Sequence, residues 1–155
     1  MIHVGAVLAK NLKIVMESNR RINYMFKLTE SQLNNIKSVG TIMLATASKD
    51  GKPHCTIVEP SKYFEDKIII PIVQMEVSKQ NILENKNVFI HVFKEDENDP
   101  ECSIQYKMNC IAEIETSGSL FEEVKHYEET EVLPEGFYVN GIIIANIIDC
   151  KEYVG

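Results

Sequence analysis

The sequence of 155 residues lacks the features that mark several specialised classes of protein. It has no Cys-x-x-Cys pair, so its four cysteines indicate neither a zinc site nor a disulfide framework, and we expect free thiols in a reducing compartment. Positive charge is also scarce, because 16 Lys and Arg stand against 23 Asp and Glu. The resulting net charge of −7 argues against binding to a nucleic-acid backbone and favours a small-molecule or protein partner.

The sequence also lacks a hydrophobic run long enough to cross a bilayer. The apolar segment from Val4 to Ala9 is short, and Lys10 and Lys13 follow it without a cleavage signal. The most hydrophobic stretch, residues 142–148, is rich in β-branched side chains and is typical of a buried strand. We therefore expect a soluble, unexported, cytoplasmic protein. There is no internal repeat, GxGxxG motif or P-loop.

The N-terminal segment is predicted to be an extension of a single domain. Val4, Val7, Leu8, Leu12 and Val15 recur at helical spacing, which predicts an amphipathic helix within the first eighteen residues. We expect residues 1–24 to dock on the domain or on a partner subunit, and residues 25–155 to form the domain.

The rest of the sequence predicts a mainly β fold of the α+β type. Thr29 and Gln32 form a capping box for a helix that ends near Gly40, and Asp50-Gly51 is a hairpin turn signal. Strands are predicted at 41–47, 54–58, 67–73, 88–93, 104–115 and 142–148, with a short helix at 78–85 and another from residue 119. Within the doubly covered strand 67–73, Pro71 marks an edge, a bulge or the strand's end. Six strands with small helices fit a nearly closed antiparallel barrel.

The segment from Ile70 to Asn85 is the candidate anion site, because it joins a strand to a helix through an irregular turn. The first amides of a helix lack partners, so a phosphate there gains several donors at once. Ser78 can offer a hydroxyl, and Lys79 and Gln80 can add their amides. The alternative, which spacing alone favours, is that Ser78 caps the helix by accepting a hydrogen bond from the Asn81 amide.

Three segments carry a resemblance to a known family: Asp50-Gly-Lys-Pro-His54, Asp66-Lys-Ile-Ile-Ile-Pro-Ile-Val-Gln-Met75 and Ser78-Lys-Gln-Asn-Ile-Leu-Glu-Asn-Lys-Asn-Val88. In their order they resemble the pyridoxamine 5′-phosphate oxidase-like family, and within it the small FMN-binding split-barrel proteins. The resemblance runs from about Met25 to Ile148. It implies a six-stranded antiparallel split β-barrel, a homodimer with FMN at the interface, and the function of a flavin-dependent oxidoreductase or electron carrier.

The resemblance also implies which residues contact the cofactor. The turn along the flavin corresponds to Pro71, Ile72, Val73, Gln74 and Met75, and the ring edge to Ile57, Val58 and Glu59. The phosphate corresponds to Val77 and Ser78, and Asn81 to a helix asparagine that helps fix the turn. Relatives frequently carry a basic residue in place of Val77 and an aromatic one in place of Glu59. Lys79, or Arg20 or Arg21 of the partner subunit, can offer the missing charge.

Two other functions stay open at this point. One is an enzyme of the same fold that acts on a pyridoxal-type vitamer or reduces a small electrophile. The other is a non-catalytic binding module that has kept the barrel and lost the flavin, as Val77 and Glu59 allow. No catalytic residue and no metal ligand is assigned, and His54 and His91 are interpreted as structural because neither has a second ligand at metal-binding spacing.

Overall fold

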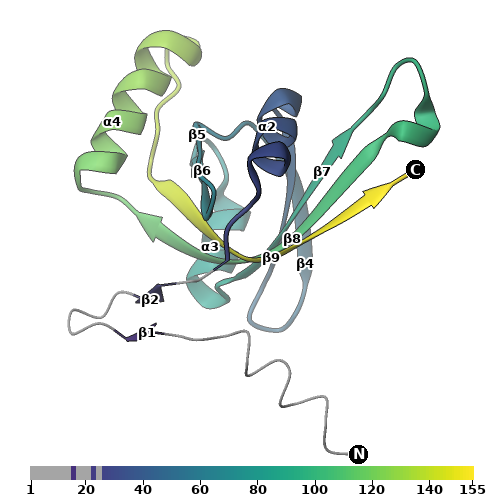
Figure 1. Cartoon of the computed structure of the whole chain (residues 1–155). Helices are drawn as coiled ribbons and strands as arrows, with labels where there is room; N and C mark the ends of the chain where they lie inside the picture. The colour runs from purple at the N-terminus through teal and green to yellow at the C-terminus, as the bar shows by residue number, and fades with distance from the viewer. Residues whose placement is uncertain (1–14, 17–21, 24–25) are drawn as a thin grey trace, which may run out of the picture.

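The computed structural model of the chain describes residues 15–16, 22–23 and 26–155 (Figure 1). Most of the predicted N-terminal helix lies outside these residues. The exception is Val15–Met16, which forms strand β1 and pairs antiparallel with β2, Ile22–Asn23. For these two residues the helix prediction was wrong, because their backbone joins a ladder between strands.

A single antiparallel sheet of seven strands makes up the body of the domain. Its strands lie in the order β4-β3-β7-β8-β9-β6-β5. Their bounds are Ile42–Ala47 for β3, Pro53–Val58 for β4, Lys62–Tyr63 for β5, Lys67–Pro71 for β6, Asn87–Lys94 for β7, Ile104–Glu115 for β8 and Ile142–Val154 for β9. The predicted mainly β, antiparallel split-barrel fold is confirmed. The sheet has seven strands instead of six because the two-residue β5, too short to leave a periodic signal, pairs with β6.

Helix α2, Glu30–Val39, begins and ends as its sequence predicts. The Gln32 amide donates to Thr29 Oγ1 at 3.2 Å, and the Thr29 amide donates to Gln32 Oε1 at 3.0 Å, so both halves of the capping box are formed. Gly40 follows the helix with a φ of 79°, a conformation that favours glycine. The helix buries Ile36 in the main core and packs against β7.

The hydrophobic core lies on one face of the sheet, and a smaller cluster lies on the other. The main core takes the inward residues of every long strand, among them Leu44, Ile90 and Met108. On β6 and the start of β9, successive isoleucines alternate between the two clusters. Strand β6 is therefore covered on both faces, as its continuous Ile run predicts.

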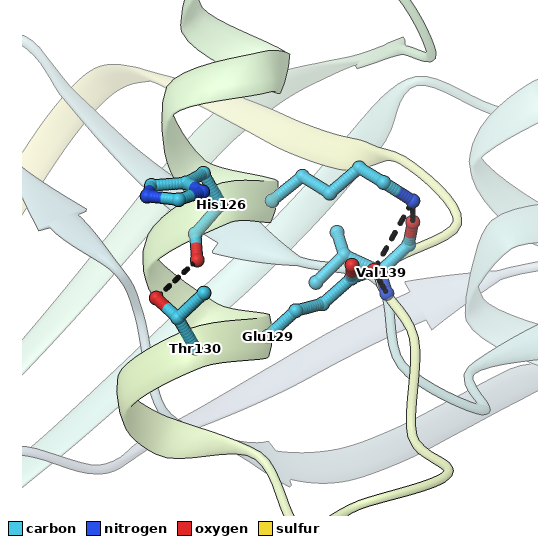
Figure 2. A network of polar contacts seen from close by, with 5 residues as sticks. His126, Glu129, Thr130 and Val139 are labelled. Carbon is cyan, nitrogen blue, oxygen red and sulfur yellow. Dashed lines mark hydrogen bonds and ion pairs between the residues drawn. The ribbon is translucent and has the colours of Figure 1, made fainter.

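Helix α4, Ser119–Tyr127, covers the outer face of β6 and β9, where Phe121 and Val124 fill the smaller cluster. A π-helical turn, η2, Glu128–Val132, continues it. The Lys125 ammonium lies 3.1 Å from Glu129 Oε1. The same oxygen accepts a hydrogen bond of 2.9 Å from the Val139 amide, and Figure 2 shows Glu129 beside Val139. Thr130 Oγ1 donates to the His126 carbonyl at 2.6 Å. The bond from the Val139 amide to Glu129 holds the segment before β9 against the helix.

Candidate functional site

The candidate site is built on the connection between β6 and helix α3, Glu76–Glu84. Pro71 is the last residue of β6 and lies opposite Ile142, so the prediction that it marks a strand end is confirmed. Ile72 still exchanges backbone hydrogen bonds of 2.9 Å with the loop before β9, donating to Gly141 and accepting from Asn140. The chain leaves the sheet only after Ile72.

The turn between sheet and helix is conformationally unusual at Gln74. Its φ of 52° makes it the single non-glycine residue with a positive φ among the described residues. A side chain with a Cβ adopts this conformation at a cost, and such residues cluster at ligand sites and switch regions. The exposed Gln74 thus redirects the chain from β6 into α3, with Val73 before it packed against the smaller cluster.

Helix α3 begins two residues earlier than the sequence predicted, because the Met75 carbonyl accepts a hydrogen bond of 2.9 Å from the Lys79 amide. Ser78 is therefore inside the first turn, and the prediction that it caps the helix was wrong. The Lys79 amide is likewise not a free donor, and Gln80 lies deeper in the helix. At the start of α3, within the part of the chain that the structure describes, the amides of Glu76, Val77 and Ser78 have no protein partner.

The hydroxyl of Ser78 also has no partner. The residue is 1% exposed, and its Oγ is the single buried side-chain oxygen or nitrogen without a hydrogen bond among the described residues. Leaving a buried hydroxyl unsatisfied costs about 1–3 kcal/mol. Four donors, three amides and one hydroxyl, are thus left unpaired within one helical turn.

Asn81, one turn further along, is fully engaged with the barrel. Its Nδ2 donates to Thr46 Oγ1 at 3.0 Å, and both residues are buried. Its carbonyl accepts a hydrogen bond of 2.7 Å from the Asn85 amide, which closes the helix. The resemblance implied that Asn81 fixes the turn, and the contact seen here fixes the helix to β3.

The charge at the start of α3 is close to neutral. Glu76 is the first helical residue, where the positive end of the helix dipole stabilises its carboxylate, and it is followed by Val77, whose side chain is 55% exposed. Lys79 is the nearest basic residue along the helix. Further along, the Glu84 carboxylate accepts hydrogen bonds from the Gln80 side chain and the Lys49 amide, which lower its pKa.

The predicted ring-edge residues at the end of β4 do not share one face. Val58 is buried in the main core, whereas Ile57 is 67% exposed and Glu59 is also exposed. Only Ile57 and Glu59 can therefore present side chains to a ligand on the outside of the sheet, and Val58 can offer backbone groups alone. Helix α3 packs on β3 and β4, so the two halves of the candidate site belong to one part of the fold.

A family model described as pyridoxamine 5′-phosphate oxidase matches residues 28–139. The chain belongs to this family. A comparison with curated proteins found no match.

Solved structures share the fold of this pyridoxamine 5′-phosphate oxidase-like chain at low identity. HupZ of Group A Streptococcus has a TM-score of 0.68 at 17% identity, over 83% of this chain and 95% of that one. An FMN-binding protein from Syntrophomonas wolfei has a TM-score of 0.62 at 14% identity, over 79% and 86%. HutZ from Vibrio cholerae, described as a heme storage protein, has a TM-score of 0.59 at 16% identity, over 83% and 95%. At these identities the likeness concerns the fold alone.

Two further findings concern metal ligands and membrane-spanning helices. Within residues 26–155 and the two short strands before them, no three His, Cys, Asp or Glu side chains are grouped in a way that could hold a metal ion. None of the described helices is both long and apolar enough to cross a membrane.

Sequence reasoning missed Glu76 as the first helical residue, because the irregular Gln74-Met75 turn carries no recognisable cap signal.

Proposed function

We propose that the chain is an FMN-binding flavoprotein, either a flavin-dependent oxidoreductase or an electron carrier. The observation that carries this proposal is the set of four unpaired donors in the first turn of α3, the amides of Glu76, Val77 and Ser78 and the Ser78 hydroxyl. A phosphate monoester accepts several hydrogen bonds at once and is stabilised by the positive end of a helix dipole. The donor set therefore fits the terminal phosphate of FMN.

In this proposal the phosphate is held by α3, and Lys79 adds the nearest positive charge. The turn at residues 71–75 lies along the flavin, where the backbone of Val73 and Gln74 can contact it, and Ile57, Val58 and Glu59 line its ring edge. The flavin would supply the electron chemistry, while the protein supplies position and electrostatics. No side chain of the chain itself is assigned an acid or base role.

We further propose a cytoplasmic homodimer with the cofactor at its interface. The domain is residues 25–155, with residues 1–24 as an extension that docks on the domain or on the partner subunit. Ile57 and Val77 support the dimer, because both are apolar, more than half exposed, and lie at the two ends of the candidate site. Arg20 or Arg21 of the partner subunit would add the positive charge that the start of α3 lacks.

The test compares FMN with riboflavin, which has the same ring and no phosphate. Purified full-length protein is titrated into each flavin, and quenching of flavin fluorescence is measured. We expect FMN to bind at least about tenfold more tightly than riboflavin, the equivalent of one charge-assisted hydrogen bond. Colourless protein that quenches neither flavin overturns the proposal, and equal affinity for both overturns the phosphate site at α3.

A second function has its own supporting observation. Glu76 and Val77 give the first turn of α3 a carboxylate and an aliphatic side chain and no basic one, which favours a split-barrel binding module that has lost the flavin. This alternative predicts a stable dimer that is indifferent to FMN. The same titration separates the two functions, and oxygen uptake with pyridoxamine phosphate tests the vitamer-oxidising enzyme.

A further inference from the structure

Three sulfur-bearing side chains lie together on the inward face of β8 and β9. Met108 and Cys110 alternate along β8 into the main core, and both are buried. Cys150 of β9 is the register partner of Met108, and its half-buried side chain packs against the same core. Directly opposite residues of an antiparallel pair have Cβ atoms about 4.5–5.5 Å apart. The Cys150 thiol and the Met108 thioether can therefore approach each other across the two strands.

A β-bulge lies between Cys110 and the other two sulfurs. The register slips by one residue between Asn109 and Cys110, which leaves Ile148 of β9 without a partner on β8. Bulges change the direction of nearby side chains and are frequent next to functional sites. The pKa of Cys110 is raised by burial first, then by Asp149, and then by Cys150, so the two thiols lie close enough to interact.

Cys150 can be reached from the edge of the sheet. Strand β6 pairs with β9 only as far as Asn146, so among the described strands the part of β9 that carries Cys150 pairs with β8 alone. Figure 1 shows this C-terminal half of β9 beside β8 and away from β6. A small ion can thus meet the half-buried thiol of Cys150 before the buried sulfurs. The unbranched Met108 side chain has rotatable bonds enough to turn its sulfur towards the ion.

We propose that Met108, Cys110 and Cys150 form a binding site for one Cu(I) ion. Two thiolates and a thioether are soft ligands, and soft ligands select Cu(I) over Mg²⁺ and Ca²⁺. Each thiol releases its proton to water as its sulfur binds the ion, so the loaded site carries one negative charge. Copper stays in the Cu(I) state throughout, and the step needs no oxidant or reductant.

Cu(I) fits this group of side chains better than zinc does. Structural zinc is almost always held by four ligands from Cys, His and carboxylates. Within the described residues no three side chains of His, Cys, Asp or Glu are grouped in that way. The third ligand here is the Met108 thioether, which suits Cu(I). The site lies on the core side of the sheet, opposite the exposed Ile57, and therefore goes beyond the proposed function.

The alternative is that the three sulfurs only fill the core, where Cys and Met pack as adaptable apolar side chains. In that case the folded protein takes up no Cu(I) at this position. The parent for the test carries Cys55→Ser and Cys102→Ser, which remove the two exposed thiols. Cu(I) is supplied anaerobically, with ascorbate, as its coloured complex with bathocuproine disulfonate, and loss of the colour measures transfer to the protein.

We expect the parent to take up one Cu(I) per chain and Cys150→Ala to abolish the transfer. Met108→Leu keeps the volume of the side chain and removes the sulfur, so it should weaken binding at least about tenfold. Met43→Leu is the matched control, because Met43 lies beside the inward Leu44 on β3 and so faces the outer side of the sheet. It should leave the affinity unchanged.

A second measurement needs no variant at the sulfurs. In the same parent, Cu(I) should slow alkylation of Cys150 by iodoacetamide, whereas Zn²⁺ should not, as followed by peptide mass spectrometry. Circular dichroism and thermal melting without metal verify that each variant is folded. The proposal is overturned if the parent takes up no Cu(I), if Met108→Leu binds as tightly as the parent, or if Zn²⁺ protects Cys150 equally well.

Failure of this site is distinguishable from failure of FMN binding at α3. Ser78→Ala should leave Cu(I) transfer unchanged, and Met108→Leu should leave the preference for FMN over riboflavin unchanged. If Ser78→Ala abolishes the transfer, the ion is not held by the three sulfurs and the copper site is disproved.

Discussion

Asn81 Nδ2 donates a hydrogen bond of 3.0 Å to Thr46 Oγ1, and this buried contact links α3 to the central part of the sheet. The first turn of α3, with its unpaired donors, lies one turn before this link. The position of the candidate phosphate site therefore depends on a polar pair whose side chains are already bonded to each other.

The Asn81 and Thr46 pair should show strong energetic coupling. Thr46→Val leaves the Asn81 amide without an acceptor, and we expect it to lower the free energy of unfolding by about 1–3 kcal/mol. Asn81→Ala should cost a similar amount. In a double-mutant cycle measured by urea denaturation, the double variant should lose less free energy of unfolding than the two single variants lose together. The reason is that the double variant leaves neither partner of the bond buried without the other. Additive costs would show that the bond does not stabilise the protein.

Ser78→Ala should separate stability from ligand binding. The substitution removes a buried hydroxyl without a partner, so the ligand-free protein should be equally stable or more stable by about 1 kcal/mol. The affinity for FMN should fall because one donor is lost. Thermal melting without FMN and fluorescence titration with FMN measure the two effects. The exposed Ser117→Ala is the control and should change neither. A destabilised ligand-free Ser78→Ala protein would contradict the unpaired state of the hydroxyl.

The sequence predicted the parts of the fold that depend on local chemistry. The Thr29 capping box, the hairpin turn at Gly51 with its φ of 84°, and the period-two pattern of β8 are each encoded by neighbouring residues. The start of α3 was missed because Met75 makes no side-chain cap and the boundary is fixed by backbone geometry at Gln74. The pairing of Met108 on β8 with Cys150 on β9 depends on the register between two strands that a helix separates in the sequence, which no single-strand pattern contains.

The four free thiols should react in an order set by burial. Cys55 and Cys102 are exposed, but a hydrogen bond from the Cys102 thiol to Asp99 raises the pKa of Cys102. Burial raises the pKa of Cys150 to about 11 and that of Cys110 to about 12. Since the thiolate is the reactive form, iodoacetamide at neutral pH should modify Cys55 first and Cys110 last. Peptide mass spectrometry after short exposures gives the order, and denatured protein, in which all four react alike, is the control.

Tyr63 should make stability fall at high pH. Burial, and to a lesser extent the nearby Glu59 carboxylate, raise the pKa of Tyr63 to about 12 from an ordinary value of 10. The unfolded chain therefore loses this proton at lower pH than the folded protein does. The contribution of Tyr63 to the free energy of unfolding is complete below pH 10 and is lost as the pH rises towards 12. Urea denaturation across this range should show a shallower decline for Tyr63→Phe than for the parent, whereas Tyr138→Phe, at an exposed tyrosine, should retain the parent slope.

The positive φ of Gln74 indicates that the turn before α3 is strained, and substitutions at this residue should reveal the strain. Glycine adopts a φ of 52° without a Cβ clash, so Gln74→Gly should be neutral or stabilising. Gln74→Val places a β-branched side chain in the same conformation and should cost about 1–2 kcal/mol in urea denaturation. Gln80→Val, in the interior of α3 with ordinary helical geometry, is the control and should cost less than Gln74→Val. If Gln74→Gly were as destabilising as Gln74→Val, the side chain of Gln74 and not its backbone conformation would determine the turn.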